Sequence, residues 1–299
     1  VDAHHEDRPL KKLKTAKIRG IESEGMLCSE LELGLSEDHE GILILPEEAP
    51  VGTLLHEYLG DVILHFDIKG GFSHLLSILG IGREIAALTE ENLDPSVIPD
   101  VSKLKVLEQP PFVDLEINDP DICSRYSALL IRNVKITSSP FWMQQRLLRL
   151  GMRPINNIVD ITNYVMMELG QPLHAFDYDM LIKRANGGKP KIIIRRAKEG
   201  EHLITLDKVE RKLDSDMLMI TDQVGHIGIA GIMGGGDSEV TSKTTNILLE
   251  AANFEFLNNR RTAQILKLRT EASERFGKQV DPEGTLRAAL RAAQLMVEH

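Results

Sequence analysis

Residues 151–177 read Gly151-Met-Arg-Pro-Ile-Asn-Asn-Ile-Val-Asp-Ile-Thr-Asn-Tyr-Val-Met-Met-Glu-Leu-Gly-Gln-Pro-Leu-His-Ala-Phe-Asp177, and the interpretation of the chain starts from them. Gly170 is expected to end a helix here, and Pro172 prevents its restart. Residues 171–177 must then leave along an extended or turned path. The helix itself is predicted by apolar residues that recur at steps of three and four, namely Ile158, Val159, Ile161, Tyr164, Val165 and Met167.

Three polar side chains of this stretch predict the lining of a small pocket. Thr162 and Asn163 lie on the predicted helix, and His174 follows it closely. This order brings a hydroxyl, an amide and an imidazole together beside an apolar wall, as in small-molecule sites. The alternative for His174 is a core histidine whose ring is satisfied by a backbone partner.

Composition limits the class of protein. The chain has 299 residues, enough for two domains, with 42% hydrophobic and 27% charged residues, as in soluble globular proteins. Aromatic residues make up 4%, which argues against broad base-stacking platforms. The net charge of −10 means that any contact with nucleic acid must use local patches. Cys28 and Cys123 match no metal or redox spacing, so two free thiols in a reducing compartment are expected.

The first third of the chain has weaker patterns. Residues 1–20 are basic and form either a solvated strand edge or a strip that faces phosphates. Short strands are expected within 17–46, a strand at 62–68, and a helix from about 74 to 88 capped by Ser73. Residues 90–111 contain four prolines and predict a linker. The abrupt opening of the chain suggests a fragment of something longer.

From residue 112 onward, short strands alternate with capped helices, which predicts one compact α+β domain. Ser139 is expected to cap a helix with Pro140 at its first position. The expected strands are 112–117, 128–134, 191–195, 217–220 and 246–250, with a hairpin at 203–213. The expected C-terminal helices are 259–268, 273–276 and 285–299.

The glycine-rich segment 228–239 lacks both the ending of a phosphate-binding loop and the spacing of a dinucleotide site. It predicts either a tight turn between strands or a backbone that approaches a ligand closely. Glu250 closes the strand expected after it. A glutamate at a strand end is ordinarily solvated, so its position alone indicates no function.

Several long motifs resemble the beta subunit of bacterial phenylalanyl-tRNA synthetase. They are spread over nearly the whole chain in the order expected for that family. They comprise residues 19–30 (RGIESEGMLCSE), 32–36 (ELGLS), 45–53 (LPEEAPVGT), 79–88 (LGIGREIAAL), 151–154 (GMRP), 160–166 (DITNYVM), 171–177 (QPLHAFD), 228–235 (GIAGIMGG) and 269–276 (RTEASERF). One departure is visible, because residues 67–73 (DIKGGFS) replace a Thr-Pro-Asn-Arg-like segment, and local function there is in doubt.

The resemblance implies a multi-domain α+β chain. Residues 1–55 correspond to the tail of a β-barrel (OB-fold) domain that resembles tRNA-binding domains, and 56–90 to a piece of the subunit's N-terminal domain. A linker at 91–111 then leads to the editing domain at 112–299, with a mixed or antiparallel sheet covered by helices. The implied partners are phenylalanine tRNA and the alpha subunit, in a cytoplasmic heterotetramer of two alpha and two beta chains, with neither membrane nor DNA.

The resemblance also implies a chemistry. The editing module removes tyrosine wrongly attached to phenylalanine tRNA, whereas aminoacylation belongs to the alpha subunit. ATP and magnesium serve the whole enzyme, and no cofactor or metal is implied for this chain. His174 is the implied catalytic residue, and it orients or deprotonates a water or contacts the terminal ribose of the tRNA. The implied substrate-binding residues are Thr162, Asn163, Ala230, Gly231 and Glu250. The alternatives are a non-catalytic module that docks tRNA or another subunit, and a synthetase-like paralogue with a structural role.

Overall fold

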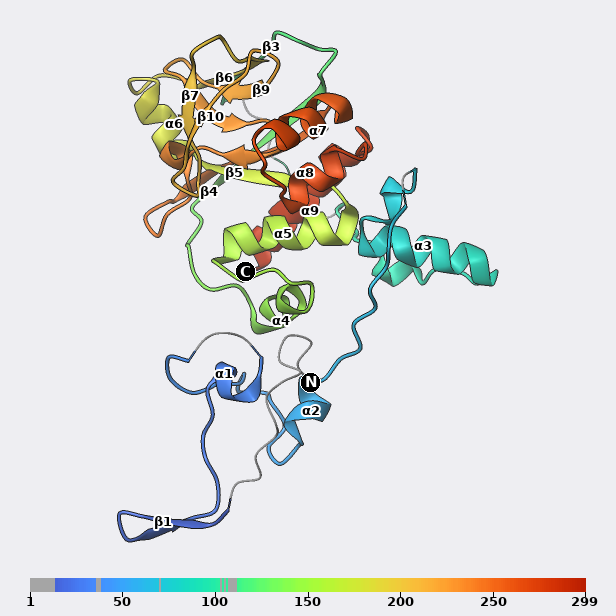
Figure 1. Ribbon diagram of the computed structural model, residues 1–299, viewed down its shortest axis with the longest axis vertical. Coiled ribbons are helices and arrows are strands. Elements are labelled where there is room, and N and C mark those ends of the chain that lie inside the picture. Colours follow the sequence, from blue (N-terminus) through green and yellow to red (C-terminus); the bar gives the residue numbers. More distant parts are fainter. Residues whose placement is uncertain (1–13, 36–38, 70, 103, 105, 107–111) are drawn as a thin grey trace. The chain divides into compact units, whose positions relative to one another are not determined.

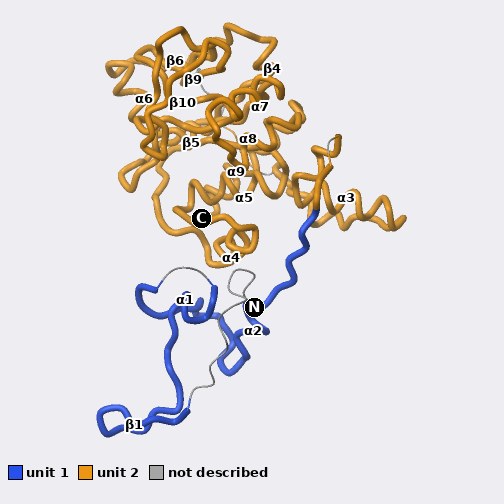
Figure 2. The backbone as a smooth tube through the Cα atoms, viewed as in Figure 1, with its two compact units in different colours: residues 1–66 blue, residues 67–299 orange. Residues whose placement is uncertain are grey.

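The computed structural model describes residues 14–35, 39–69, 71–102, 104, 106 and 112–299 (Figure 1). The chain divides into two compact units, residues 1–66 and 67–299 (Figure 2). The finer boundaries at residues 55, 90 and 111 remain predictions. No described helix is long and apolar enough to span a bilayer.

The first unit contains little regular structure. Strands β1 (Ala16–Ile18) and β2 (Ile21–Ser23) form an antiparallel ladder, and helices α1 (Glu30–Leu33) and α2 (Leu55–Tyr58) follow. Among the described residues, the short strands expected within 17–46 are therefore found only up to residue 23. Of the basic residues at the start, Lys14, Lys17 and Arg19 are exposed, and Arg8, Lys11 and Lys12 lie outside the described residues.

Two more differences from the sequence expectations lie at the boundary between the units and at the start of the second unit. Residues 62–68, which span the boundary, form no strand. An alternating pattern forms a stable strand only where one of its faces is buried, and Val62, Ile63 and Leu64 are all exposed. The helix expected from about residue 74 is divided in two. A 3-10 turn, η1 (Ser73–Leu75), comes first, and the α-helix α3 (Ile78–Thr89) starts only at Ile78. Ser77, and not Ser73, caps α3, since its hydroxyl accepts a hydrogen bond from the Gly80 amide at 3.0 Å. The predicted linker contains the 3-10 turn η2 (Pro95–Val97).

Two β-sheets form the centre of the second unit (Figure 1). The five-stranded sheet has the order β11-β10-β9-β6-β3, and only β3 and β6 among its described pairs are parallel. The three-stranded sheet has the order β4-β12-β5 and is antiparallel. The α+β class with a mixed sheet and an antiparallel sheet is thereby confirmed. The strands are β3 (Asp114–Ile117), β4 (Cys123–Arg132), β5 (Leu173–Asp177), β6 (Lys191–Arg196), β9 (Leu218–Thr221), β10 (His226–Ile229), β11 (Met233–Gly234) and β12 (Asn246–Phe254).

Strand β12 is buried on both faces and separates two parts of the core. Ile247, Leu249 and Ala251 pack with the apolar residues of the helices α4 (Phe141–Arg149), α5 (Asn157–Leu169) and α9 (Gly284–Glu298). Leu248 and Ala252 point the other way and pack against the five-stranded sheet. The alternation of side chains along a strand explains this division. The result is a layer of helices, a three-stranded sheet and a five-stranded sheet, in that order.

A third cluster covers the far face of the five-stranded sheet. It joins Met219 and Ile229 to residues of the hairpin β7 (His202–Ile204) and β8 (Glu210–Lys212) and of the helix α7 (Phe256–Ile265). The hairpin predicted at 203–213 is confirmed. The remaining elements are α6 (Tyr178–Arg184), α8 (Glu271–Phe276) and the 3-10 turn η3 (Gly236–Ser238).

Local signals determine the helices that precede β5. Helix α5 is capped by the side chain of Asn156 and ends at Gly170, whose φ of 83° is the left-handed value that glycine favours, as predicted. Ser139 does not cap α4; its hydroxyl donates to a buried Asp160 carboxylate oxygen at 2.5 Å. That carboxylate also accepts the Ile155 amide at 2.7 Å, so it ties the start of α4 to the start of α5.

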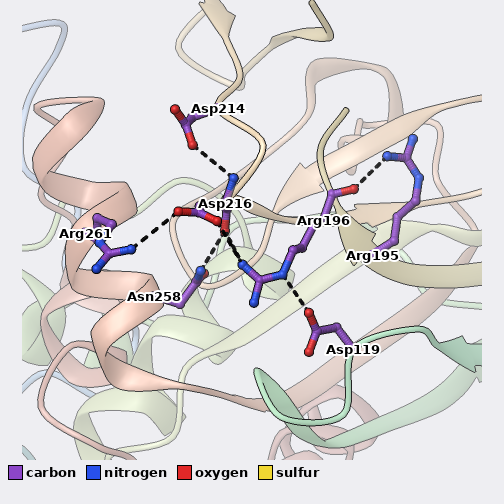
Figure 3. Close-up of polar contacts among 7 residues, drawn as sticks. All are labelled: Asp119, Arg195, Arg196, Asp214, Asp216, Asn258 and Arg261. Atoms are coloured by element: carbon purple, nitrogen blue, oxygen red, sulfur yellow. Dashed lines mark hydrogen bonds and ion pairs between the residues drawn. The ribbon is translucent and has the colours of Figure 1, made fainter. Parts of the chain in front are cut away.

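A polar network links α7 to the edge of the five-stranded sheet (Figure 3). The Arg196 guanidinium donates to Asp119 at 2.6 Å and reaches Asp216 at 3.3 Å. Asp216 in turn contacts Arg261, and its backbone carbonyl accepts from Asn258 at 2.6 Å. Exposed ion pairs each contribute about 1 kcal/mol or less, so this network orients α7 more than it stabilises the fold.

Candidate functional site

The register of the three-stranded sheet brings the candidate residues together. His174 on β5 pairs directly with Glu250 on β12, and Glu250 pairs with Ala128 on β4. Tyr126 lies two positions from Ala128 along β4 and therefore faces the same side of the sheet. Three strands that are distant in sequence thus present an imidazole, a carboxyl group and a phenol to the space between the two sheets.

A small cavity of about 70 Å³ lies against this face. Of the six predicted site residues, His174, Gly231 and Glu250 line it. The remaining lining residues come from β5 and the residue before it, β9, β10, β11, the turn between β10 and β11, and α8. They are apolar or glycine: Pro172, Leu173, Phe176, Ile220, Gly228, Ile229, Ile232, Met233, Gly234, Ala272 and Phe276.

Glu250 is buried in the middle of its strand, with 6% of its surface exposed. The predicted end of the strand at Glu250 is wrong, because β12 continues for four residues to Phe254. Tyr126 donates its hydroxyl to Oε2 of Glu250 at 2.7 Å. Burial raises the pKa of the Glu250 carboxyl to about 7, and the Tyr126 hydrogen bond acts against that rise. Near neutral pH this carboxyl therefore exchanges between its neutral and charged forms.

His174 is held as a neutral imidazole. Burial lowers the pKa of its ring to about 4. The ring lies edge-on to Phe176, with ring centres 4.4 Å apart. Its Nε2 atom is buried and has no hydrogen-bond partner among the described residues. A core histidine with both nitrogens satisfied does not fit this environment, whereas a ligand or a water molecule in the cavity would supply a partner.

Two glycines shape the wall opposite the sheet. Gly231 has a φ of +68°, and a Cβ there would lie 2.4 Å from Nδ2 of Asn259. A Cβ on Gly234 would lie 2.6 Å from Cε1 of His174. The glycine-rich segment thus contains a tight turn between strands, which was the first of the two alternatives predicted for it. At Gly234 its backbone also lies close to the imidazole of His174.

The other three predicted residues are Thr162, Asn163 and Ala230. The structure describes all three, and none of them lines the cavity. Thr162 is buried on α5, and its hydroxyl donates to the Val159 carbonyl at 2.7 Å. Asn163 is half-buried on the same helix. Ala230 is buried in the turn. Its backbone amide already donates to the Leu218 carbonyl at 2.9 Å, so this amide is not available to a substrate in this conformation.

Sequence reasoning missed Tyr126 and Gly234. A tyrosine inside an apolar strand is ordinary, and only the pairing of β4 with β12 shows that it contacts Glu250. Gly234 is one of three consecutive glycines, and nothing in the sequence indicates which one meets the imidazole. Within the described part of the chain, no group of three histidine, cysteine or carboxylate side chains is placed to bind a metal ion.

Comparison with known proteins agrees with this architecture. Residues 122–299 match the family model described as "B3/4 domain", and residues 8–54 match the one described as "Putative tRNA binding domain". The chain therefore belongs to the B3/4 domain family, with its cavity inside the matched region. More specifically, its sequence is similar to phenylalanine–tRNA ligase beta subunits, which confirms the resemblance noted from its motifs.

Two curated relatives illustrate the similarity. The phenylalanine–tRNA ligase beta subunit of Dehalococcoides mccartyi is 49% identical over 286 residues, covering 96% of this chain and 34% of that protein. The one from Symbiobacterium thermophilum is 48% identical over 289 residues, covering 94% and 31%. The chain thus spans about a third of the length of these relatives. A solved N-terminal fragment of the phenylalanyl-tRNA synthetase beta subunit from Pyrococcus horikoshii, 16% identical, covers 67% of this chain and 58% of that one with a TM-score of 0.38, a likeness too weak to define the fold.

Proposed function

We propose that this chain carries the editing activity of a phenylalanine–tRNA ligase, namely hydrolysis of tyrosine from phenylalanine tRNA. The observation that supports this most is a buried carboxyl group, Glu250, in the same small cavity as a neutral imidazole, His174. The whole ligase would supply the alpha subunit, ATP and magnesium for aminoacylation in the cytoplasm, in a heterotetramer of two alpha and two beta chains. This chain would act on the product.

The carboxyl group accounts for selectivity. Tyrosine differs from phenylalanine by one hydroxyl, and a site built to bind that hydroxyl rejects the analogue that lacks it. Among the described residues, Tyr126 is the hydrogen-bond partner of the Glu250 carboxyl, and it occupies Oε2. Oε1 remains to accept the phenolic hydrogen. Phenylalanine would leave the buried carboxyl without this bond, at a cost of about 1–3 kcal/mol.

The imidazole accounts for hydrolysis. A neutral histidine whose Nε2 atom lacks a partner can accept a proton from a water molecule or hold that water in place. The ester between an amino acid and tRNA is activated, so a positioned water and a stabilised oxyanion suffice without a covalent nucleophile. Contact between His174 and the terminal ribose of the tRNA is the other role open to it. Thr162 and Asn163, on α5, would act from outside the cavity.

The cavity must widen when a substrate binds. Its 70 Å³ hold a few water molecules, and a tyrosyl side chain is larger. The three-stranded sheet is held by a long ladder, whereas the opposite side contains the half-buried Met233 on the two-residue strand β11, next to the β10–β11 turn. We infer that residues 230–234 move to admit the ring.

Hydrolysis of tyrosyl-tRNA and phenylalanyl-tRNA by the isolated chain tests this proposal. High enzyme and low salt are needed, because the chain is acidic and phosphate contacts weaken with salt. Faster release of tyrosine than of phenylalanine, with both releases slowed by His174→Ala, is the expected result. Binding of the tRNA with no release of either amino acid would instead support the alternative of a non-catalytic docking module.

A further inference from the structure

The buried contact between Tyr126 and Glu250 joins two strands that are 124 residues apart. Tyr126 is 9% exposed and Glu250 is 6% exposed, and their oxygens are 2.7 Å apart. Tyr126 pairs with Ala252 across the β4–β12 ladder, so it lies diagonal to Glu250 on the same face. Diagonal neighbours on a sheet are within reach of a long aromatic side chain. The geometry of the ladder thus makes this hydrogen bond.

We propose that Tyr126 is a positioning residue that sets the specificity of this site for a phenolic ligand. Its hydroxyl occupies Oε2 of Glu250 and fixes the carboxyl plane, which leaves Oε1 to accept the hydroxyl of the ligand. The same bond favours the charged carboxylate, since Tyr126 donates to it. This inference rests on the proposed editing function and adds to it a residue that does not line the cavity.

Glu250 is the group of this cluster that changes its charge near neutral pH. From β4, Cys123 and Tyr126 face it, and burial raises the pKa of the Cys123 thiol to about 12 and that of the Tyr126 hydroxyl well above its usual range. From β5, His174 faces it and has a pKa lowered to about 4. The residues that β9, β10, β11 and α8 contribute to the cavity are apolar or glycine. All of these neighbours are therefore neutral between pH 6 and pH 9.

Tyr126→Phe removes the hydroxyl and keeps the ring. A hydrogen bond to a charged group is strong enough that its loss shifts the pKa of the Glu250 carboxyl upward by about one to two pH units. At pH 7.5 most of the carboxyl would then be neutral, and a neutral carboxyl accepts a weaker hydrogen bond. The preference for tyrosyl-tRNA over phenylalanyl-tRNA is expected to fall roughly tenfold.

The titration of Glu250 can be followed without any activity. The 299-residue chain, labelled with carbon-13 at glutamate carboxyl groups, is titrated by NMR, and Glu250→Gln assigns the resonance. The matched control is Tyr178→Phe, because Tyr178 also donates its hydroxyl over 2.7 Å, but to the Phe112 carbonyl. The hydrolysis ratio of the two aminoacyl-tRNAs is measured on the same variants between pH 6 and pH 9.

The expected result is an upward shift of the Glu250 midpoint and a reduced tyrosine preference in Tyr126→Phe, with neither change in Tyr178→Phe. A Tyr126→Phe protein that is less stable but keeps the wild-type midpoint and preference would overturn the inference. An absence of tyrosyl-tRNA hydrolysis by the wild-type chain would reject the proposed function. In that case the NMR midpoint still decides whether Tyr126 controls the carboxyl group.

Discussion

Replacement of Glu250 by glutamine is predicted to stabilise the fold at alkaline pH and to leave it almost unchanged at acid pH. The carboxyl has a pKa of about 7 in the folded chain against the usual 4.5. The folded state therefore holds a proton that the unfolded state releases, and the carboxyl lowers stability as pH rises from 4.5 to about 7. The full difference of 2.5 pH units corresponds to about 3–4 kcal/mol at about 1.4 kcal/mol per unit.

Glutamine has the shape of glutamate and an amide oxygen that still accepts the Tyr126 hydroxyl, so the substitution removes only the ionisation. Urea unfolding at pH 8 should show a gain of about 3 kcal/mol over the wild type, and at pH 5 a gain below about 1 kcal/mol. Glu199→Gln, at an exposed position, is the control and should change little at either pH. Equal effects of Glu250→Gln at both pH values would refute the reasoning, because the stability change would then be independent of ionisation.

Three further predictions concern the cavity. Glu250→Ala should slow hydrolysis of tyrosyl-tRNA by roughly one to two decades and that of phenylalanyl-tRNA far less, since it removes the acceptor for the phenolic hydroxyl; equal slowing would make the glutamate catalytic or structural. His174→Ala should slow both reactions in single-turnover assays and preserve their ratio; a changed ratio would instead assign His174 to recognition. Gly234→Ala should displace the imidazole, because its Cβ would lie 2.6 Å from His174 Cε1, and a crystal structure with the ring unmoved would contradict this.

The sequence predicted the structure best where the signals are local. The helix that ends at Gly170 and the hairpin β7–β8 depend on periodicity, a left-handed glycine and turn residues within a few positions. The strand through Glu250 was predicted too short, because Ala251, Ala252 and Asn253 favour strands weakly and are held in β12 by its two neighbours.

The site was predictable only in part, because the pairing of strands that are distant in sequence leaves no local signal. His174 and the glycine-rich turn around Gly231 were predicted from local sequence, whereas Glu250 was predicted only through a resemblance to a family. The register of distant strands is what brings these residues together. The contact of Tyr126 with Glu250 depends on how β4 aligns with β12, and no nearby residue encodes that alignment. Residues 62–68 show the converse, since their alternation predicts a strand and no adjacent strand pairs with them among the described residues.

The two sides of the cavity differ in how they are built, one from the three-stranded sheet and the other from β9, β10, β11 and the turn between β10 and β11. His174, Glu250 and the supporting Tyr126 sit on three hydrogen-bonded strands, so their mutual spacing is fixed by the ladder itself. Residues 231–234 on the opposite side belong to the β10–β11 turn and the two-residue strand β11, and the side chains of Ile232 and Met233 can change without breaking the ladder of the three-stranded sheet. Under the proposed editing function, selection could change which ring is admitted through substitutions at these positions while His174, Glu250 and Tyr126 stay in place.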